Sequence, residues 1–173
     1  MCSSDLWNKL SVWPSLARQK GSIMPIRCEI VSQDRMVYEG DADMVVVPGE
    51  SGQMGILPNH APLLSTLKYG ILTVRTKGVD EYFTIAGGFV EVQPDIITVM
   101  ADAAENVREI DISRAEDARH RAEQFLKEGP PPDTDSYLAM EAALRRSNLR
   151  LEAVQRFRRS QSRIPGSDQG ERE

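Results

Sequence analysis

The chain has 173 residues, of which 40% are hydrophobic and 27% charged, and its formal net charge is −5 at pH 7. This composition predicts one or two small soluble domains, and the net charge argues against a nucleic-acid-binding protein. No run approaches the roughly 20 apolar residues that a membrane-spanning helix needs. Two cysteines, Cys2 and Cys28, are too few for a metal cluster or a disulfide framework and favour a reducing, cytoplasmic setting.

Residues 1–23 show only a weak amphipathic turn, which Pro14 ends. A helix that anchors a protein to a membrane surface normally has a stronger apolar face and a basic polar face. We therefore favour a disordered or loosely packed extension over such an anchor. Met24 directly precedes the first regular alternation of the sequence.

Between residues 24 and 107 apolar and polar residues alternate with a period of two, as in the segments 26–30 and 90–93. This period is typical of strands with one buried face. Turn-forming pairs recur at short intervals, which indicates an antiparallel sandwich or barrel. The pairs include Tyr69-Gly70, Lys77-Gly78, Gly87-Gly88 and Pro94-Asp95. Because Gly87-Gly88 lies between apparent strands, it is better explained by a bulge or a close backbone approach than by phosphate binding.

After Val107 the period becomes helical, and an antiparallel helical hairpin is predicted over residues 108–159. Asp111 is placed to cap the first helix, and Gly129 with three following prolines ends that helix. A second helix carries apolar residues at three- and four-residue intervals and is basic toward its end. Its arginines could meet an acidic protein surface or form a solvated face. Residues 160–173 are polar and are expected to be disordered.

The segment 51–64 contains two glycines, two prolines and one of the two histidines of the chain, His60. Such a shaped loop suits either catalysis or docking. His60 lacks an evident nucleophile, and neither a metal-binding spacing nor a phosphate-binding glycine motif is found. A docking loop in a protein that is not an enzyme is therefore the favoured interpretation.

Three motifs occur in order: Ser-Gly-Gln-Met-Gly-Ile-Leu-Pro-Asn-His-Ala-Pro-Leu-Leu at 51–64, Ile-Ala-Gly-Gly-Phe-Val-Glu-Val-Gln-Pro-Asp at 85–95 and Ile-Asp-Ile-Ser-Arg-Ala at 110–115. Together they resemble the epsilon subunit of bacterial F-type ATP synthases over residues 24–158. The resemblance implies an α+β fold, with an antiparallel β-sandwich of about ten strands followed by a two-helix hairpin. It implies a non-catalytic rotor subunit that couples proton translocation to ATP synthesis.

The implied partners are the gamma subunit, the ring of c subunits and the catalytic alpha/beta hexamer, with a peripheral location on the cytoplasmic face of the plasma membrane. The loop is expected to face ring and stalk through Gln53, Met54, Pro58 and His60. Many relatives have an acid where Gln53 stands, so a hydrogen bond rather than a salt bridge to the ring is expected. The resemblance implies a hairpin that is either compact against the sandwich or extended along gamma into the catalytic hexamer, where it blocks ATP hydrolysis.

No metal or cofactor is required, but some relatives bind ATP as a regulatory ligand on the compact hairpin. The residues that match this pattern are Glu105, Asp111, Arg114, Arg121, Arg146 and Arg150. Arginines pair with phosphate oxygens, which suits such a site. Asp111 could equally serve only as a helix cap, and Arg114 and Arg121 could be solvated. A free-standing β-sandwich module that senses a nucleotide or binds another ligand is the alternative for the whole chain.

Overall fold

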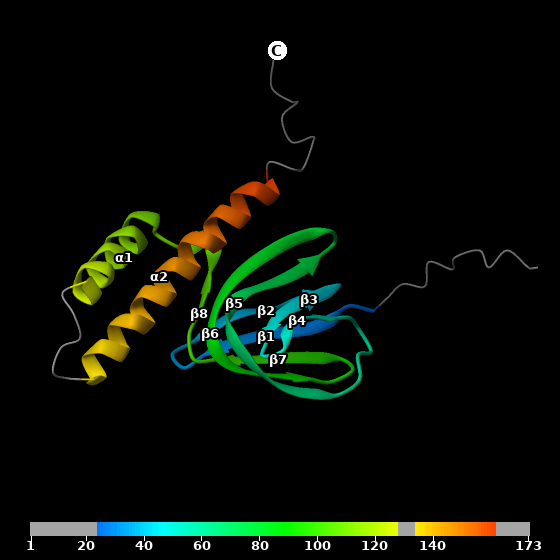
Figure 1. Ribbon diagram of the computed structural model, residues 1–173. Coiled ribbons are helices and arrows are strands. Elements are labelled where there is room, and N and C mark those ends of the chain that lie inside the picture. The colour runs from blue at the N-terminus through cyan, green and yellow to red at the C-terminus, as the bar shows by residue number, and fades with distance from the viewer. Residues whose placement is uncertain (1–23, 128–133, 162–173) are drawn as a thin grey trace, which may run out of the picture.

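The computed structural model describes residues 24–127 and 134–161, which form a β domain followed by two α-helices (Figure 1). The expected architecture of a β-sandwich and a C-terminal helical pair is confirmed. The predictions for residues 1–23, for the helix stop at 129–132 and for residues 162–173 lie outside the described residues. No described helix is long and apolar enough to cross a membrane.

Eight strands form the described β domain, in the spatial order β2-β1-β7-β6-β5-β3-β4, with β8 paired to β6. All pairs are antiparallel except β1 with β7, which is parallel, so the sheet is mixed rather than purely antiparallel. The strands are β1 (Ile26–Ser32), β2 (Met36–Ala42), β3 (Met44–Gly49), β4 (Gly52–Ile56), β5 (Leu63–Thr76), β6 (Val79–Val92), β7 (Ile96–Ala101) and β8 (Ala104–Asn106).

The described domain has eight strands rather than about ten because β5 and β6 are each continuous over 14 residues. The expected turns at Tyr69-Gly70 and Gly87-Gly88 lie inside these strands. Gly88 has φ +111°, and a Cβ atom there would lie 2.2 Å from the carbonyl oxygen of Met100 on β7. The glycine pair is therefore a point of close backbone approach, as the sequence indicated.

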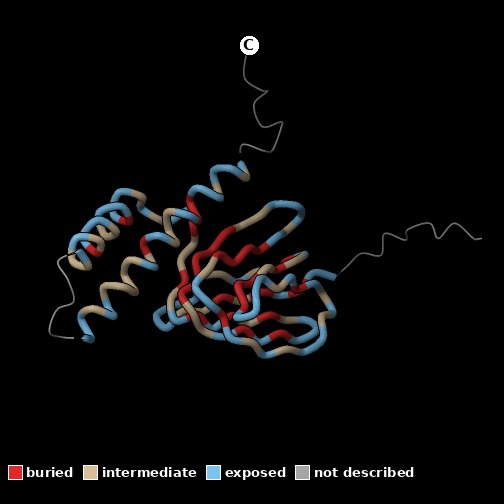
Figure 2. The backbone as a smooth tube through the Cα atoms, viewed as in Figure 1, coloured by how far each residue is buried: buried red, intermediate tan, exposed pale blue. Residues whose placement is uncertain are grey.

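The core lies between the two layers formed as the sheet folds over itself, and Figure 2 shows buried residues alternating along its strands. Ile26, Cys28 and Ile30 of β1 are fully buried, in agreement with the period of two. Phe83 is the largest fully buried side chain and meets Tyr38 edge to face at 5.3 Å between ring centroids. Burial raises the pKa of the Cys28 thiol to about 12, which makes this thiol unreactive.

The helical hairpin consists of α1 (Ile112–Lys127) and α2 (Thr134–Gln161), preceded by a short 3-10 turn, η1 (Val107–Glu109). Asp111 caps α1, as predicted: its Oδ1 accepts hydrogen bonds from the Arg114 backbone N–H at 3.2 Å and from the Ser113 hydroxyl at 2.8 Å. These hydrogen bonds to the ionised form lower the pKa of Asp111.

The helix α2 joins the hairpin to the sandwich, whereas α1 packs mainly on α2 (Figure 1). A second apolar cluster lies at this junction. Its central buried residues are Ile71, Tyr82, Val107, Ala153 and Val154, with Phe157 packed against them. The Phe157 ring meets Tyr82 edge to face at 6.2 Å, and the Arg108 guanidinium lies 5.8 Å from the same ring. Ile112, at the start of α1, also packs against this cluster, so the hairpin is attached mainly, not solely, through one side of α2.

Candidate functional site

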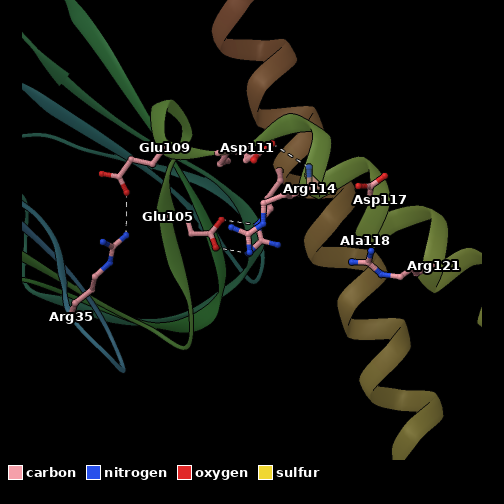
Figure 3. Close-up of a pocket in the computed structure, with 11 residues that line it drawn as sticks. Arg35, Glu105, Glu109, Asp111, Arg114, Asp117, Ala118 and Arg121 are labelled. Atoms are coloured by element: carbon pink, nitrogen blue, oxygen red, sulfur yellow. Dashed lines mark hydrogen bonds and ion pairs between the residues drawn. The ribbon is translucent and has the colours of Figure 1, made fainter.

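A cavity of about 490 Å³ lies between the hairpin and the sandwich (Figure 3). Its volume is within the range of small-molecule pockets. The lining residues are Arg35, Glu105, Glu109, Ile110, Asp111, Arg114, Ala115, Asp117, Ala118, Arg121 and Arg150. Five of the six residues predicted for a nucleotide site thus line one cavity. The sixth, Arg146, lies in a smaller adjoining hollow together with Glu105 and Arg150. We call the larger cavity the hairpin pocket.

Glu105 and Arg150 form an ion pair that ties α2 to β8 across the hairpin pocket. Arg150 donates from Nε to Glu105 Oε2 at 2.6 Å and from Nη2 to Oε1, so the contact is bidentate. Both side chains are about one-third exposed, at 31% for Arg150 and 35% for Glu105. The hydrogen bond to Glu105 is the largest cause that raises the pKa of Arg150. In this conformation both oxygens of the Glu105 carboxylate already accept hydrogen bonds from Arg150.

Arg114 and Arg121 are the cations that remain available in the hairpin pocket. They are seven residues apart on α1, so they lie on the same face of the helix. Within the described residues neither guanidinium forms an ion pair. An unpaired guanidinium offers up to five N–H donors to an anion, and phosphate oxygens fit this geometry.

Arg35, Glu109 and Asp117 also line the hairpin pocket and were not predicted from the sequence. Arg35 comes from the β1–β2 connection, and its Nη2 lies 3.1 Å from Glu109 Oε2. Their side chains are 58% and 62% exposed. No pattern in the sequence links residue 35 to residue 109, because only the folded sheet brings the β1–β2 connection next to η1. Within the described residues, no group of three or more His, Cys, Asp or Glu could hold a metal ion.

The predicted docking residues lie on the edge strand β4 and in the loop after it. Gln53 is exposed near the start of β4, and Met54 is partly buried against the core. Pro58 and His60 are half-buried in the loop, where His60 Nδ1 lies 2.8 Å from its neighbour's carbonyl oxygen, Ala61 O. Since strands rise about 3.3 Å per residue, Gln53 and the end of β4 at Ile56 are roughly 10 Å apart. The four residues therefore lie along the β4 edge of the sheet and do not form one compact cluster.

The docking strand is also close to the hairpin. A hollow of about 290 Å³ is lined on one side by the start of β4, including Gly52 and Gln53, and on the other by Leu149, Glu152 and Arg156 of α2. Movement of α2 away from the sandwich would therefore change the surroundings of Gln53.

Comparisons with known proteins agree with this architecture. The family model described as the ATP synthase delta/epsilon chain, beta-sandwich domain, matches residues 25–107, and the long alpha-helix domain of the same chain matches residues 108–155. The ATP synthase epsilon chain of Herpetosiphon aurantiacus is 44% identical over 137 residues, which cover 79% of this chain and 98% of the relative. The epsilon chain of Moorella thermoacetica is 43% identical over 130 residues, 75% of this chain and 96% of the relative.

A solved structure is similar in fold. It is a cryo-EM structure of the Euglena gracilis mitochondrial ATP synthase with OSCP, F1 and c-ring in rotational state 1. The TM-score is 0.55 at 21% identity, with 80% of this chain and 82% of that chain covered. The two family matches and the near-complete coverage of the curated relatives show that the chain belongs to the ATP synthase delta/epsilon family and is an epsilon chain.

Proposed function

We propose that this epsilon chain joins the gamma subunit to the c ring and restrains ATP hydrolysis through its helical hairpin. The chain is a non-catalytic subunit of the ATP synthase central stalk. The observation that carries the proposal is the attachment of the hairpin mainly through one side of α2. A hairpin held in this way can leave the sandwich without unfolding it.

The sandwich is the docking part in this proposal, with the edge strand β4 facing the c ring on the cytoplasmic side of the membrane. The exposed amide of Gln53 would donate or accept one neutral hydrogen bond where an acid would form an ion pair. A tagged chain purified from solubilised membranes should bring gamma and the c ring with it. Gln53→Ala should reduce recovery of the c ring, whereas Gln33→Ala, an exposed glutamine outside this edge, should not. Recovery of the chain without any synthase subunit would contradict the proposal.

The hairpin acts as the inhibitor when α2 leaves the sandwich. In the compact form Arg150 is paired with Glu105. The pKa of Asp80 is lowered chiefly by its hydrogen bond with Arg75, and the charge of Arg156 on α2 adds a small part. Release of α2 would free these two cations of α2 and present them, with Arg145 and Arg158, to acidic surfaces of the catalytic alpha/beta hexamer. Exposed charge pairs weaken with ionic strength, so the inhibition should weaken with salt.

A truncation tests the inhibitory role. A chain that ends after residue 129 lacks α2, and its assembled enzyme should hydrolyse ATP faster than the enzyme with the full chain. A chain that ends after Gln161 keeps both helices and is the matched control. Equal hydrolysis with both truncated chains, with assembly intact, would show that α2 does not inhibit.

The hairpin pocket is the proposed site for ATP as a regulatory ligand. Arg114 and Arg121 offer unpaired guanidinium groups for phosphate, and the walls come from α1, α2, η1 and β8. A ligand that needs all these elements binds only the compact form, so it stabilises that form by mass action. ATP would therefore hold the hairpin on the sandwich and relieve inhibition.

Isothermal titration calorimetry of the full chain with ATP tests this site. Arg121→Ala should weaken binding because the variant loses a phosphate ligand. Arg145→Ala is the control, since Arg145 pairs with Glu141 on α2 at 3.5 Å and does not line the pocket. Absence of heat at millimolar ATP, or equal losses in both variants, would refute this part of the proposal.

A further inference from the structure

One face of α2 carries two separate contacts with the rest of the chain. Ala153, Val154 and Phe157 follow Arg150 by three, four and seven residues, so all four lie on the same face of the helix. Arg150 pairs with Glu105 at one end of this face, and Phe157 packs against the second apolar cluster at the other end. Since an α-helix rises about 1.5 Å per residue, the two contacts are roughly 10 Å apart along α2. Two contacts at this separation fix the direction of the helix as well as its position.

Phe157 contacts two groups that only an aromatic ring can satisfy together. Tyr82 meets the Phe157 ring edge to face, with 6.2 Å between the ring centroids. The Arg108 guanidinium lies 5.8 Å from the centroid of the same ring. Both attractions depend on the negative face and positive edge of the aromatic ring. An aliphatic side chain at position 157 would fill part of the space but would lose both contacts.

The groups that receive Phe157 are held in place without any hydrogen bond from α2. The Tyr82 hydroxyl lies 3.4 Å from Asp80 Oδ2, and Arg75 donates to the Asp80 carboxylate from Nε at 2.6 Å and from Nη2 at 3.0 Å. The backbone N–H of Arg108 donates to Asn106 Oδ1 at 2.9 Å, which caps η1. The Arg108 guanidinium forms no ion pair with any described residue, so it is free to face the ring. We call Tyr82 and Arg108 the Phe157 site, which is ready to receive the ring whenever α2 returns.

We propose that Phe157 is a positioning residue that sets the equilibrium between the compact form and the form in which α2 is released. This inference rests on the proposed inhibition of ATP hydrolysis by released α2. Phe157 does not line the hairpin pocket, so it changes this equilibrium without touching a ligand there. It also lies beyond residues 108–155, the part that the family model of the long alpha-helix domain matches.

The direction of the effect separates this role from a contact with the catalytic hexamer. If Phe157 holds α2 on the sandwich, loss of the ring releases α2 and strengthens inhibition. If Phe157 acted by touching the hexamer after release, loss of the ring would weaken inhibition. A general loss of helix stability would also weaken inhibition, because the inhibiting helix itself would be damaged.

ATP hydrolysis by the assembled enzyme measures the equilibrium. The enzyme whose chain ends after residue 129 lacks α2 and gives the uninhibited rate. At an ATP concentration where the full chain lowers this rate by about half, the compact and released forms are about equally populated. Phe157→Ala should then lower the compact-to-released ratio about tenfold, so that roughly nine-tenths of the enzyme is inhibited. Phe157→Tyr keeps the ring and should restore the ratio of the wild type.

Arg108→Gln tests the same contact from η1. This variant loses the cation over the ring, so the compact-to-released ratio should fall about threefold. In the Phe157→Ala background the same change should have no further effect, because no ring is left for the cation to face. Leu138→Ala is the control on α2, since Leu138 is 55% exposed and lies outside both apolar clusters, and its ratio should equal that of the wild type.

Circular dichroism checks that each variant is folded. A compact-to-released ratio in Phe157→Ala that equals or exceeds that of the wild type would overturn the role of Phe157, while inhibition by α2 stands. An effect of Arg108→Gln that is equally large with and without the ring would overturn it as well. Equal hydrolysis by the enzymes with the truncated and the full chain would overturn the inhibition and the role of Phe157 together.

Discussion

The Glu105–Arg150 ion pair is expected to hold α2 against the sandwich, and a double-mutant cycle measures its strength. Glu105→Gln and Arg150→Gln each remove one charge and leave the partner charge unpaired, and the double variant removes both. Two N–H groups of Arg150 donate to the two oxygens of Glu105, one of them at 2.6 Å. No other ion pair in the described part of the chain connects α2 to the β domain.

The expected coupling energy follows from the exposure of the two side chains. Fully exposed pairs contribute about 0.2–1 kcal/mol, and hydrogen bonds to charged groups about 1.5–3 kcal/mol. At 31% and 35% exposure the pair lies between these classes, so solvent screens part of its attraction. We expect a coupling energy of about 1–2 kcal/mol.

Urea unfolding of the full chain, followed by circular dichroism of the helices, gives the free energy of unfolding for the four proteins of the cycle. The Arg35–Glu109 pair provides a second cycle, and its more exposed side chains should give a smaller coupling of about 0.2–1 kcal/mol. A Glu105–Arg150 coupling below about 0.3 kcal/mol, within the error of additivity, would refute the role of the pair as a link.

Three further changes test the local structure. Gly88→Ala should lower the free energy of unfolding by about 2–4 kcal/mol, whereas Gly78→Ala, at φ +80° with no atom within 4 Å of its Cβ, should cost about 1–2 kcal/mol. Arg75 lowers the pKa of Asp80 from 3.8, so this stabilisation is complete above that pH and is lost as the pH falls through the folded-state pKa. Asp80→Asn should therefore be less stable than the wild type at pH 7, and urea unfolding should show the difference shrinking as the pH falls below 3.8. Asp111→Ala should reduce helix content by circular dichroism, whereas Asp111→Asn should retain it, because asparagine caps equally well.

Local patterns were sufficient to predict much of this fold. Ile26, Cys28 and Ile30 are buried as their alternation indicates, and Asp111 caps the helix that it precedes. These features follow from the spacing of residues along one strand or one helix, and this spacing can be read directly from the sequence. The six residues proposed for ATP binding came from the family resemblance, and five of them line one cavity.

Long-range pairing could not be predicted in the same way. The parallel pairing of β1 with β7 joins Arg27 to Ile96, and no local pattern specifies such a partner. The pair Tyr69-Gly70 looks like a turn, yet it lies inside the long strand β5, where Gly70 packs closely against Pro48 of β3. Arg35 was missed for the same reason, since it reaches the hairpin pocket only through the folded sheet.

In the proposed mechanism α2 leaves and rejoins the sandwich under control of ATP. Two dyes attached through Val79→Cys, at the exposed start of β6, and Gln155→Cys, on the exposed face of α2, report this movement by energy transfer. Cys2→Ser removes one native thiol, and the buried Cys28 with its raised pKa does not compete for label. In the assembled enzyme, transfer should be high at saturating ATP and should fall when ATP is removed. Equal transfer in both conditions would show that ATP does not control the position of α2.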